Sequence, residues 1–250
     1  MPIALFTDFG SADIYVGQVK AVLAAESPAV PVIDLLNDAP AFDVEAAAHL
    51  LAALAPEFPA GTVFLAVVDP GVGTSRGAIV IEADGRSFVG PDNGLLSVLY
   101  QRARDARCHA IVWKPQRLTS SFHGRDLFAP VAARLAAGTL PEEWLAPKAT
   151  PDVLLDPGPL FRVIYVDHYG NCATGIPAER MDRRARLALA GREVCYARVF
   201  GEAEPGEPFW YENSSGLVEI AIAGESAARA LGIGVGTPLS PAAPGSPGSR

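Results

Sequence analysis

The sequence is poor in cysteine and has no long apolar run. Its 250 residues include three cysteines, an odd number, and no two of them have C-x-x-C spacing. This usage predicts neither a disulfide framework nor a zinc site, and it is typical of proteins in a reducing compartment. The longest apolar runs, such as residues 63–68, are far shorter than a membrane span.

Basic residues are also scarce. Lysine and arginine number 20 against 28 aspartates and glutamates, which gives a net charge of −8. A negative chain is a poor match for nucleic acid or an anionic membrane, and it is better suited to a cationic ligand. The first stretch, MPIALFTDFG, carries no basic segment before Asp8. We therefore expect no signal peptide and a soluble, cytoplasmic protein.

Apolar residues are plentiful, and their pattern predicts an α/β domain. They make up 50% of the chain, which is enough for a sizeable core. Strands are expected at residues 3–7, 31–36 and 62–68, and helices between them at residues 12–26 and 44–58. Asp43 is placed to cap the second helix. Such alternation predicts a mostly parallel sheet with helices on both faces.

A different pattern follows. Residues 78–90 predict a hairpin around an Asp-Gly turn, and GPDNG (90–94) predicts a turn that leads into a helix. Residues 109–114 predict another strand, and a further helix is expected to end at Gly138. We expect this N-terminal α/β domain to span residues 1–146.

A smaller second domain is expected after a proline-rich connection. Four prolines fall within residues 147–159, which predicts an extended linker. Short apolar segments separated by turn residues then predict a mainly β domain over residues 160–238. Residues 239–250 are rich in proline, glycine and serine and predict a disordered tail.

The loop DPGVGTSR (69–76) begins like a phosphate-binding loop. A dinucleotide fingerprint needs a third glycine where Arg76 stands and a helix after the loop, but a hairpin is predicted there. No Lys-Ser/Thr pair of a Walker loop follows either. The stretch is therefore either a tight turn or a site built around its aspartate and its arginine.

Polar residues stand at the predicted strand ends, where α/β folds place ligands. Asp8 follows the first strand and Asp69 follows the third. His123 lies on a glycine-flanked loop before a helix that Asp126 could cap. A metal-dependent phosphohydrolase fits the same residues as a metal-free site does, and it would use Asp8, Asp69, Asp92 and His123. Composition and spacing do not decide between these readings.

Aromatic and amide side chains alternate at two places in the expected second domain. DHYGN (167–171) and FWYENSSG (209–216) set aromatic rings beside asparagine, and the first also has an aspartate. Aromatic faces and such polar edges suit a nucleobase and a ribose. Core aromatics with ordinary turn residues are the equally simple alternative.

Six motifs together resemble one known family. They are TDFG-x2-D-x-YVG (7–17), VVDPGVGTSR (67–76), GPDNG (90–94), SSFHGRDLFAP (120–130), DHYGN (167–171) and NSSG (213–216). In this order they resemble the S-adenosyl-L-methionine hydroxide adenosyltransferases, which are related to enzymes that fluorinate or chlorinate the same substrate. Each motif alone is weak, but six in register make the resemblance highly specific.

The resemblance implies a fold and a reaction. The implied fold is an N-terminal α/β domain and a C-terminal β-barrel-like domain. The implied assembly is a homotrimer that binds its ligand between the N-domain of one subunit and the C-domain of the next. The implied reaction is S-adenosyl-L-methionine plus water giving adenosine and L-methionine, with no metal and no cofactor.

The resemblance also implies site residues. The family's Asp–Arg–His trio falls on Asp69, Arg76 and His123. The implied substrate contacts are Asp8 and Phe42 at the ribose, Asp13, Asp167 and Ser214 at the methionine end, Tyr169 and Asn171 at the adenine, and the backbone near Ile222 and Gly224 at the adenine edge.

The trio bears on the choice between water and halide as the nucleophile. The halogenases lack its aspartate and carry tyrosine where His123 stands, so the resemblance favours the hydrolytic branch. A halogenase and a non-catalytic sensor of the adenosyl ligand are the other readings. We expect Asp69 and His123 to share the proton of the attacking water and Arg76 to orient Asp69.

Overall fold

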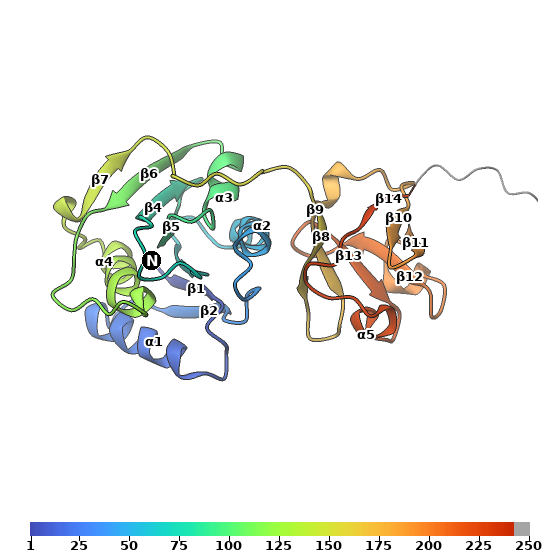
Figure 1. Cartoon of the computed structure of the whole chain (residues 1–250), viewed down its shortest axis with the longest axis horizontal. Coiled ribbons are helices and arrows are strands. Elements are labelled where there is room, and N and C mark those ends of the chain that lie inside the picture. The colour runs from blue at the N-terminus through green and yellow to red at the C-terminus, as the bar shows by residue number, and fades with distance from the viewer. Residues whose placement is uncertain (243–250) are drawn as a thin grey trace, which may run out of the picture. The chain divides into compact units, whose positions relative to one another are not determined.

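The computed structural model describes residues 1–242 and divides into two compact units, Met1–Pro157 and Gly158–Arg250. Each unit is built around one seven-stranded sheet (Figure 1). Within residues 1–242, no helix is both long and apolar enough to cross a membrane.

The sheet of the first unit has the strand order β2-β1-β3-β5-β4-β6-β7. Its strands are β1 (Ile3–Thr7), β2 (Val32–Leu36), β3 (Val63–Val67), β4 (Ala78–Ala83), β5 (Arg86–Pro91), β6 (Ala106–Ile111) and β7 (Leu145–Lys148). Strands β2, β1, β3 and β5 are parallel neighbours, and only β4 and β7 run against the others. The predicted α/β class with a mostly parallel sheet is confirmed.

Helices flank this sheet, as the alternating pattern predicts. They are α1 (Ile14–Glu26), α2 (Val44–Leu54), α3 (Ser97–Arg102) and α4 (Ala129–Ala137). Helix α1 packs against α4, and α2 packs against α3 (Figure 1). The Asp43 carboxylate caps α2 by accepting from the backbone N–H of Ala46 at 3.0 Å, and α4 ends at Gly138 with a left-handed φ of 70°. Strands β1 and β3 are buried along their whole length, because both faces of the sheet are covered.

Two local expectations for the first unit need correction. The linker expected at residues 147–159 begins inside β7, which pairs with β6 at the edge of the sheet, a place where Pro147 costs no ladder hydrogen bond. The helix expected before Gly138 begins with a π-helical turn, η2 (Gly124–Phe128), and Asp126 lies inside that turn rather than at a cap. Sequence periodicity does not distinguish a π turn from the first turn of an α-helix.

The sheet of the second unit has the strand order β14-β10-β11-β12-β13-β9-β8. Its strands are β8 (Leu160–Val166), β9 (Cys172–Pro177), β10 (Leu187–Leu189), β11 (Arg192–Tyr196), β12 (Pro208–Glu212), β13 (Leu217–Ile222) and β14 (Ser240–Pro241), with the short helix α5 (Ala227–Leu231). The chain before β14 returns to β8, where Leu239 donates to the Phe161 carbonyl at 3.1 Å and Val163 donates to the Thr237 carbonyl at 2.9 Å. The sheet thereby curls toward closure around the buried Trp210, which confirms the β-barrel-like fold.

The expected tail is partly wrong. Leu239 is buried, Ser240 and Pro241 form β14 against β10, and Ala242 donates to the Arg186 carbonyl at 2.7 Å. Composition missed this strand because one apolar side chain and a few backbone hydrogen bonds leave little trace in a Pro/Gly/Ser-rich stretch. Residues 243–250 lie outside the described residues.

Candidate active site

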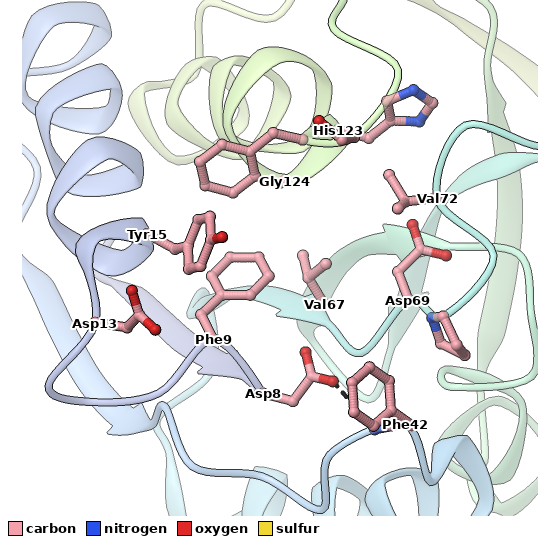
Figure 2. A pocket seen from close by; sticks show the side chains of 13 residues that line it. Asp8, Phe9, Asp13, Tyr15, Phe42, Val67, Asp69, Val72, His123 and Gly124 are labelled. Carbon is pink, nitrogen blue, oxygen red and sulfur yellow. Dashed lines mark hydrogen bonds between the residues drawn. The ribbon is translucent and has the colours of Figure 1, made fainter.

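A pocket of about 390 Å³ opens at the carboxyl ends of β1 and β3 (Figure 2). Its walls come from the loops after these two strands, from the start of α1, from the loop before α2 and from residues 121–124. Asp8, Asp13, Phe42, Asp69 and His123 all line it. The structure therefore brings together five of the residues expected at the site, at the edge of the sheet where ligands usually bind.

Arg76 holds Asp69 in a fixed orientation. Its Nε donates to both carboxylate oxygens of Asp69, at 3.0 and 3.1 Å, and its terminal NH2 group also donates to Oδ2. The remaining NH1 group donates to the Gly77 carbonyl at 3.1 Å, and the guanidinium lies 5.2 Å from the centre of the Phe128 ring. The side chains are only 10% and 4% exposed, so the ion pair is largely shielded from water.

The same guanidinium reaches His123. The Arg76 NH2 group lies 3.1 Å from His123 Nδ1. Because a guanidinium can only donate, Nδ1 must accept, and the proton of the neutral ring is then on Nε2. Burial, and next the nearby Arg76 charge, lower the pKa of His123 below its usual range. His123 is therefore a neutral ring that offers an N–H group, and Arg76 bonds both other members of the trio.

A backbone contact brings the two loops this close. Gly73 has φ +79°, and a Cβ added there would lie 2.2 Å from the Ser120 carbonyl oxygen. The hydroxyl of Thr74 donates to the Gly71 carbonyl at 2.7 Å and tightens the same turn. Glycine at position 73 thus lets the DPGVGTSR loop press against the loop that carries His123.

Asp126 shapes the loop before His123 instead of capping a helix. Its Oδ2 accepts from the backbone N–H and the hydroxyl of Thr119, at 2.9 and 2.6 Å, and Arg125 donates to both of its oxygens. Burial alone would raise the pKa of Asp126, but these hydrogen bonds lower it to about 2. Arg125 also donates to Gln18 at 2.9 Å, which ties the loop to α1.

Asp8 and Phe42 meet on the floor of the pocket. The Phe42 backbone N–H donates to Asp8 Oδ2 at 3.2 Å, as the dashed line in Figure 2 shows. Burial raises the pKa of Asp8, with a smaller contribution from Asp69. Phe42 has a left-handed φ of 62° and its side chain is 79% exposed, which is unusual for a large apolar residue. Asp13 caps α1 through the Ile14 N–H at 2.6 Å.

Three aromatic residues of the pocket were missed by the sequence analysis. The rings of Phe9, Tyr15 and Phe122 lie 5.3 to 6.2 Å from one another and form an apolar part of the pocket lining. Figure 2 labels Phe9 and Tyr15. Phe9 and Tyr15 stand in the TDFG-x2-D-x-YVG motif and Phe122 in SSFHGRD. Their position in these motifs was the only available signal, since aromatic residues in a sequence look alike in a core and in a pocket.

The other expected contacts lie in the second unit. Asp167 accepts from the backbone and side-chain N–H groups of Asn171, at 2.8 and 2.9 Å, and the tight turn between them leaves Tyr169 76% exposed. Ser214 is exposed on the turn between β12 and β13. Ile222 ends β13 with its side chain buried, and Gly224 follows it at the surface.

The acidic residues do not gather as a metal site requires. Asp92, which the phosphohydrolase reading needs, does not line the pocket and instead lies 3.4 Å from the Lys148 ammonium. Among residues 1–242, no group of three or more His, Cys, Asp or Glu side chains is placed to hold a metal ion. With Asp69 bound on both oxygens by Arg76, this geometry does not favour the phosphohydrolase reading.

Comparisons with known proteins agree on one family. Residues 3–144 match the SAM hydroxide adenosyltransferase N-terminal domain and residues 161–240 match the C-terminal domain of the same family. A protein of Thermus thermophilus named (R)-S-adenosyl-L-methionine hydrolase is 40% identical, over 95% of this chain and 98% of its own. One of the same name from Salinispora arenicola is 39% identical, over 95% and 96%. A fluorinase of Actinopolyspora mzabensis is 25% identical, over 88% and 89%.

Solved structures are similar over nearly the whole chain. An uncharacterized conserved protein from Thermotoga maritima superposes with a TM-score of 0.85 at 34% identity, over 96% of this chain and 100% of its own. A conserved hypothetical protein from Thermus thermophilus superposes with a TM-score of 0.73 at 38% identity, over 96% and 99%.

The protonation of His123 can be measured directly. In ¹⁵N-labelled protein near neutral pH, we expect the His123 signals to show a bare Nδ1 and a protonated Nε2, because Arg76 donates to Nδ1. Acid titration should reach its midpoint below the ordinary histidine value of about 6.5. His123→Ala identifies the signals, and the exposed His168 serves as the internal reference. A proton on Nδ1 in the neutral ring would contradict the hydrogen-bond pattern.

Proposed function

The chain belongs to the SAM hydroxide adenosyltransferase family, and we propose that it hydrolyses S-adenosyl-L-methionine to adenosine and L-methionine. The observation that carries this proposal is a hydrogen-bonded chain in which Asp69 and His123 line the pocket and Arg76 bonds to both. Such an arrangement suits a nucleophile that must lose a proton as it attacks. A halide has no proton to lose, so nothing in the trio favours the halogenase reading.

The chemical difficulty lies in the nucleophile and not in the leaving group. Water attacks the ribose C5′ as the bond from C5′ to sulfur breaks, and the electron pair of that bond neutralises the sulfonium. Methionine then leaves as a neutral thioether, which needs no acid to protonate it, and we propose that no cofactor takes part. Free water has a pKa of about 15.7, so a positioned base is needed to accept its proton as the new bond forms.

Asp69 is the group that accepts this proton. His123 offers an N–H at Nε2, and its other nitrogen is already occupied by Arg76. His123 therefore donates to the oxygen of the attacking water and stabilises its developing hydroxide character. Arg76 aims the Asp69 carboxylate, and the walls of the pocket align the water with C5′, which can supply several kcal/mol of effective concentration. Sharing of the proton between Asp69 and His123, the simpler expectation, does not fit the tautomer.

The first unit holds the ribose and the start of the methionine chain. Asp8 uses Oδ2 to accept from the Phe42 N–H, which leaves Oδ1 for the ribose hydroxyls. The Phe42 ring stands beside the pocket, where it can cover the sugar. Asp13, on the rim at the start of α1, is placed for the cationic amino end of the substrate.

The second unit of a neighbouring copy completes the site in a homotrimer. Phe42 and Tyr169 are 79% and 76% exposed, so both aromatic rings are accessible to a substrate or to a neighbouring subunit. Tyr169 would stack on the adenine, Asn171 and the backbone at Ile222 and Gly224 would meet its edge, and Asp167 and Ser214 would hold the amino-acid end. Each of these residues has the chemistry that its contact requires.

We also propose a reducing compartment, such as the cytoplasm. Cys108, Cys172 and Cys195 are all free thiols. Burial raises the pKa of Cys108 to about 11 and that of Cys172 to about 12, so both stay protonated and poorly reactive. This pattern supports a protein that does not depend on disulfides.

Asp69→Asn tests the proposed base. The amide keeps the shape of the carboxylate but cannot accept the proton, so we expect kcat to fall about 10²–10⁴-fold with little change in KM. Wild-type protein should release adenosine and methionine in equal amounts, measured by liquid chromatography. Asp105 is an exposed carboxylate just before β6, and Asp105→Asn is the control that should keep the wild-type rate. No product from the wild type, or full activity in Asp69→Asn, would refute the proposal.

Mixed trimers test the shared site. Asp69→Asn disables the first unit, and Tyr169→Ala removes the proposed adenine stack from the second. If each site combines units from two copies, trimers reassembled from an equal mixture should regain up to about a quarter of wild-type activity, because about one interface in four is intact. A site made within one chain predicts no recovery, since no chain carries both intact units.

A further inference from the structure

The GPDNG turn (90–94) lies under the loop that carries Asp69 and Arg76. The Asn93 side-chain amide donates from Nδ2 to the carbonyl of Val68 at 2.9 Å. Val68 is fully buried and immediately precedes Asp69. Asn93 therefore holds the chain at the point where it leaves β3 and enters the loop.

The neighbouring residue holds the other end of the same loop. The backbone N–H of Asp92 donates to the Gly77 carbonyl at 3.0 Å. That carbonyl is also the acceptor for Arg76 NH1, at 3.1 Å. Two consecutive residues of one turn thus fix the entry and the exit of the loop, and the exit contact also fixes the guanidinium.

The turn itself has little freedom to move. Asn93 Oδ1 accepts from the Leu95 N–H at 3.2 Å, which sets the orientation of the amide. A Cβ at Gly90 would lie 2.4 Å from the Ala66 carbonyl oxygen, so glycine there allows β5 to approach β3 closely. This approach brings Asn93 within reach of Val68.

The Asp92 carboxylate anchors the far side of the turn. It is buried, and its Oδ1 accepts from the Asp152 backbone N–H at 2.9 Å. The Lys148 ammonium lies 3.4 Å from its Oδ2 and 2.6 Å from Asp152. The turn is therefore held between the segment that follows β7 and the loop that follows β3.

We propose that Asn93 is a positioning residue for the hydrolytic reaction. Through the Val68 carbonyl it sets the direction in which Asp69 leaves β3, and hence where the carboxylate and Arg76 stand relative to the water and C5′. This inference rests on the proposed function. The GPDNG turn, which the sequence alone predicts as an ordinary turn, then contributes to catalysis. It does so without touching the substrate.

The expected effect falls on kcat rather than on KM. Asp8, Phe42 and Asp13, which are proposed to hold the substrate, lie on other loops and keep their contacts when Asn93 changes. The Asp69–Arg76 pair stays together but shifts as a unit. A displacement of about 1 Å at the reacting groups can cost about 10²-fold in rate.

Asn93→Asp separates the two hydrogen bonds of this side chain. The carboxylate can still accept from the Leu95 N–H, but it cannot donate to the Val68 carbonyl. We expect kcat to fall about 10²-fold, with KM within about threefold of wild type. Asn93→Ser should show the same loss of kcat, because the serine side chain is too short to reach the Val68 carbonyl. It replaces Asn93→Asp in the test if Asn93→Asp does not fold.

Ser97→Ala is the matched control. Ser97 is buried at the start of α3, donates to the Gly94 carbonyl at 2.8 Å and accepts from the Leu155 N–H at 3.0 Å. Loss of the Ser97 hydroxyl removes two hydrogen bonds beside the GPDNG turn but none to the loop that carries Asp69 and Arg76. Thermal stability should therefore fall, while kcat stays within about twofold of wild type.

The outcomes separate this inference from the proposed function. Wild-type kcat in folded Asn93 variants, or an equal loss of kcat in Ser97→Ala, overturns the positioning role alone. A wild-type protein that releases no adenosine and methionine overturns the proposed function instead.

Discussion

The hydrogen bonds of the Arg76 guanidinium determine how the rest of the site is arranged. One group binds both oxygens of Asp69, the Gly77 carbonyl and Nδ1 of His123. A guanidinium is always charged and can only donate, so it holds the Asp69 carboxylate in one orientation and places the proton of the neutral His123 ring on Nε2. The different roles that we assign to Asp69 and His123 follow from this one interaction.

The fold is arranged so that this interaction can form. Strand β3 delivers Asp69 to the pocket, Gly73 lets its loop press against the Ser120 backbone, and Asn93 fixes the point where the loop begins. On the other side, Asp126 and Arg125 hold the loop of His123 against α1. Contacts within and behind the loops therefore place the trio, and aromatic rings and Asp8 line the rest of the pocket.

Much of the fold could be predicted, because strong local patterns carry it. The apolar runs of β1 and β3, the Asp43 cap and the Gly138 stop are each set by nearby residues. Strands β7 and β14 were missed because edge pairing with distant partners lets a proline-containing segment join a sheet. The site residues also divide into those that local sequence patterns predict and those that depend on long-range contacts. Strand ends pointed to Asp8 and Asp69, but the contacts of Asn93, Arg125 and the Phe9 ring depend on segments far apart in the sequence.

The central claim is that water, aligned by the pocket and deprotonated by Asp69, attacks C5′ directly. A single turnover of S-adenosyl-L-methionine in ¹⁸O-water, with enzyme in excess, tests it most directly. Direct attack predicts adenosine carrying ¹⁸O at its 5′ oxygen in the first turnover, together with unlabelled methionine. First-turnover adenosine without the label would mean that an oxygen of the protein attacked C5′ first, and it would contradict this account.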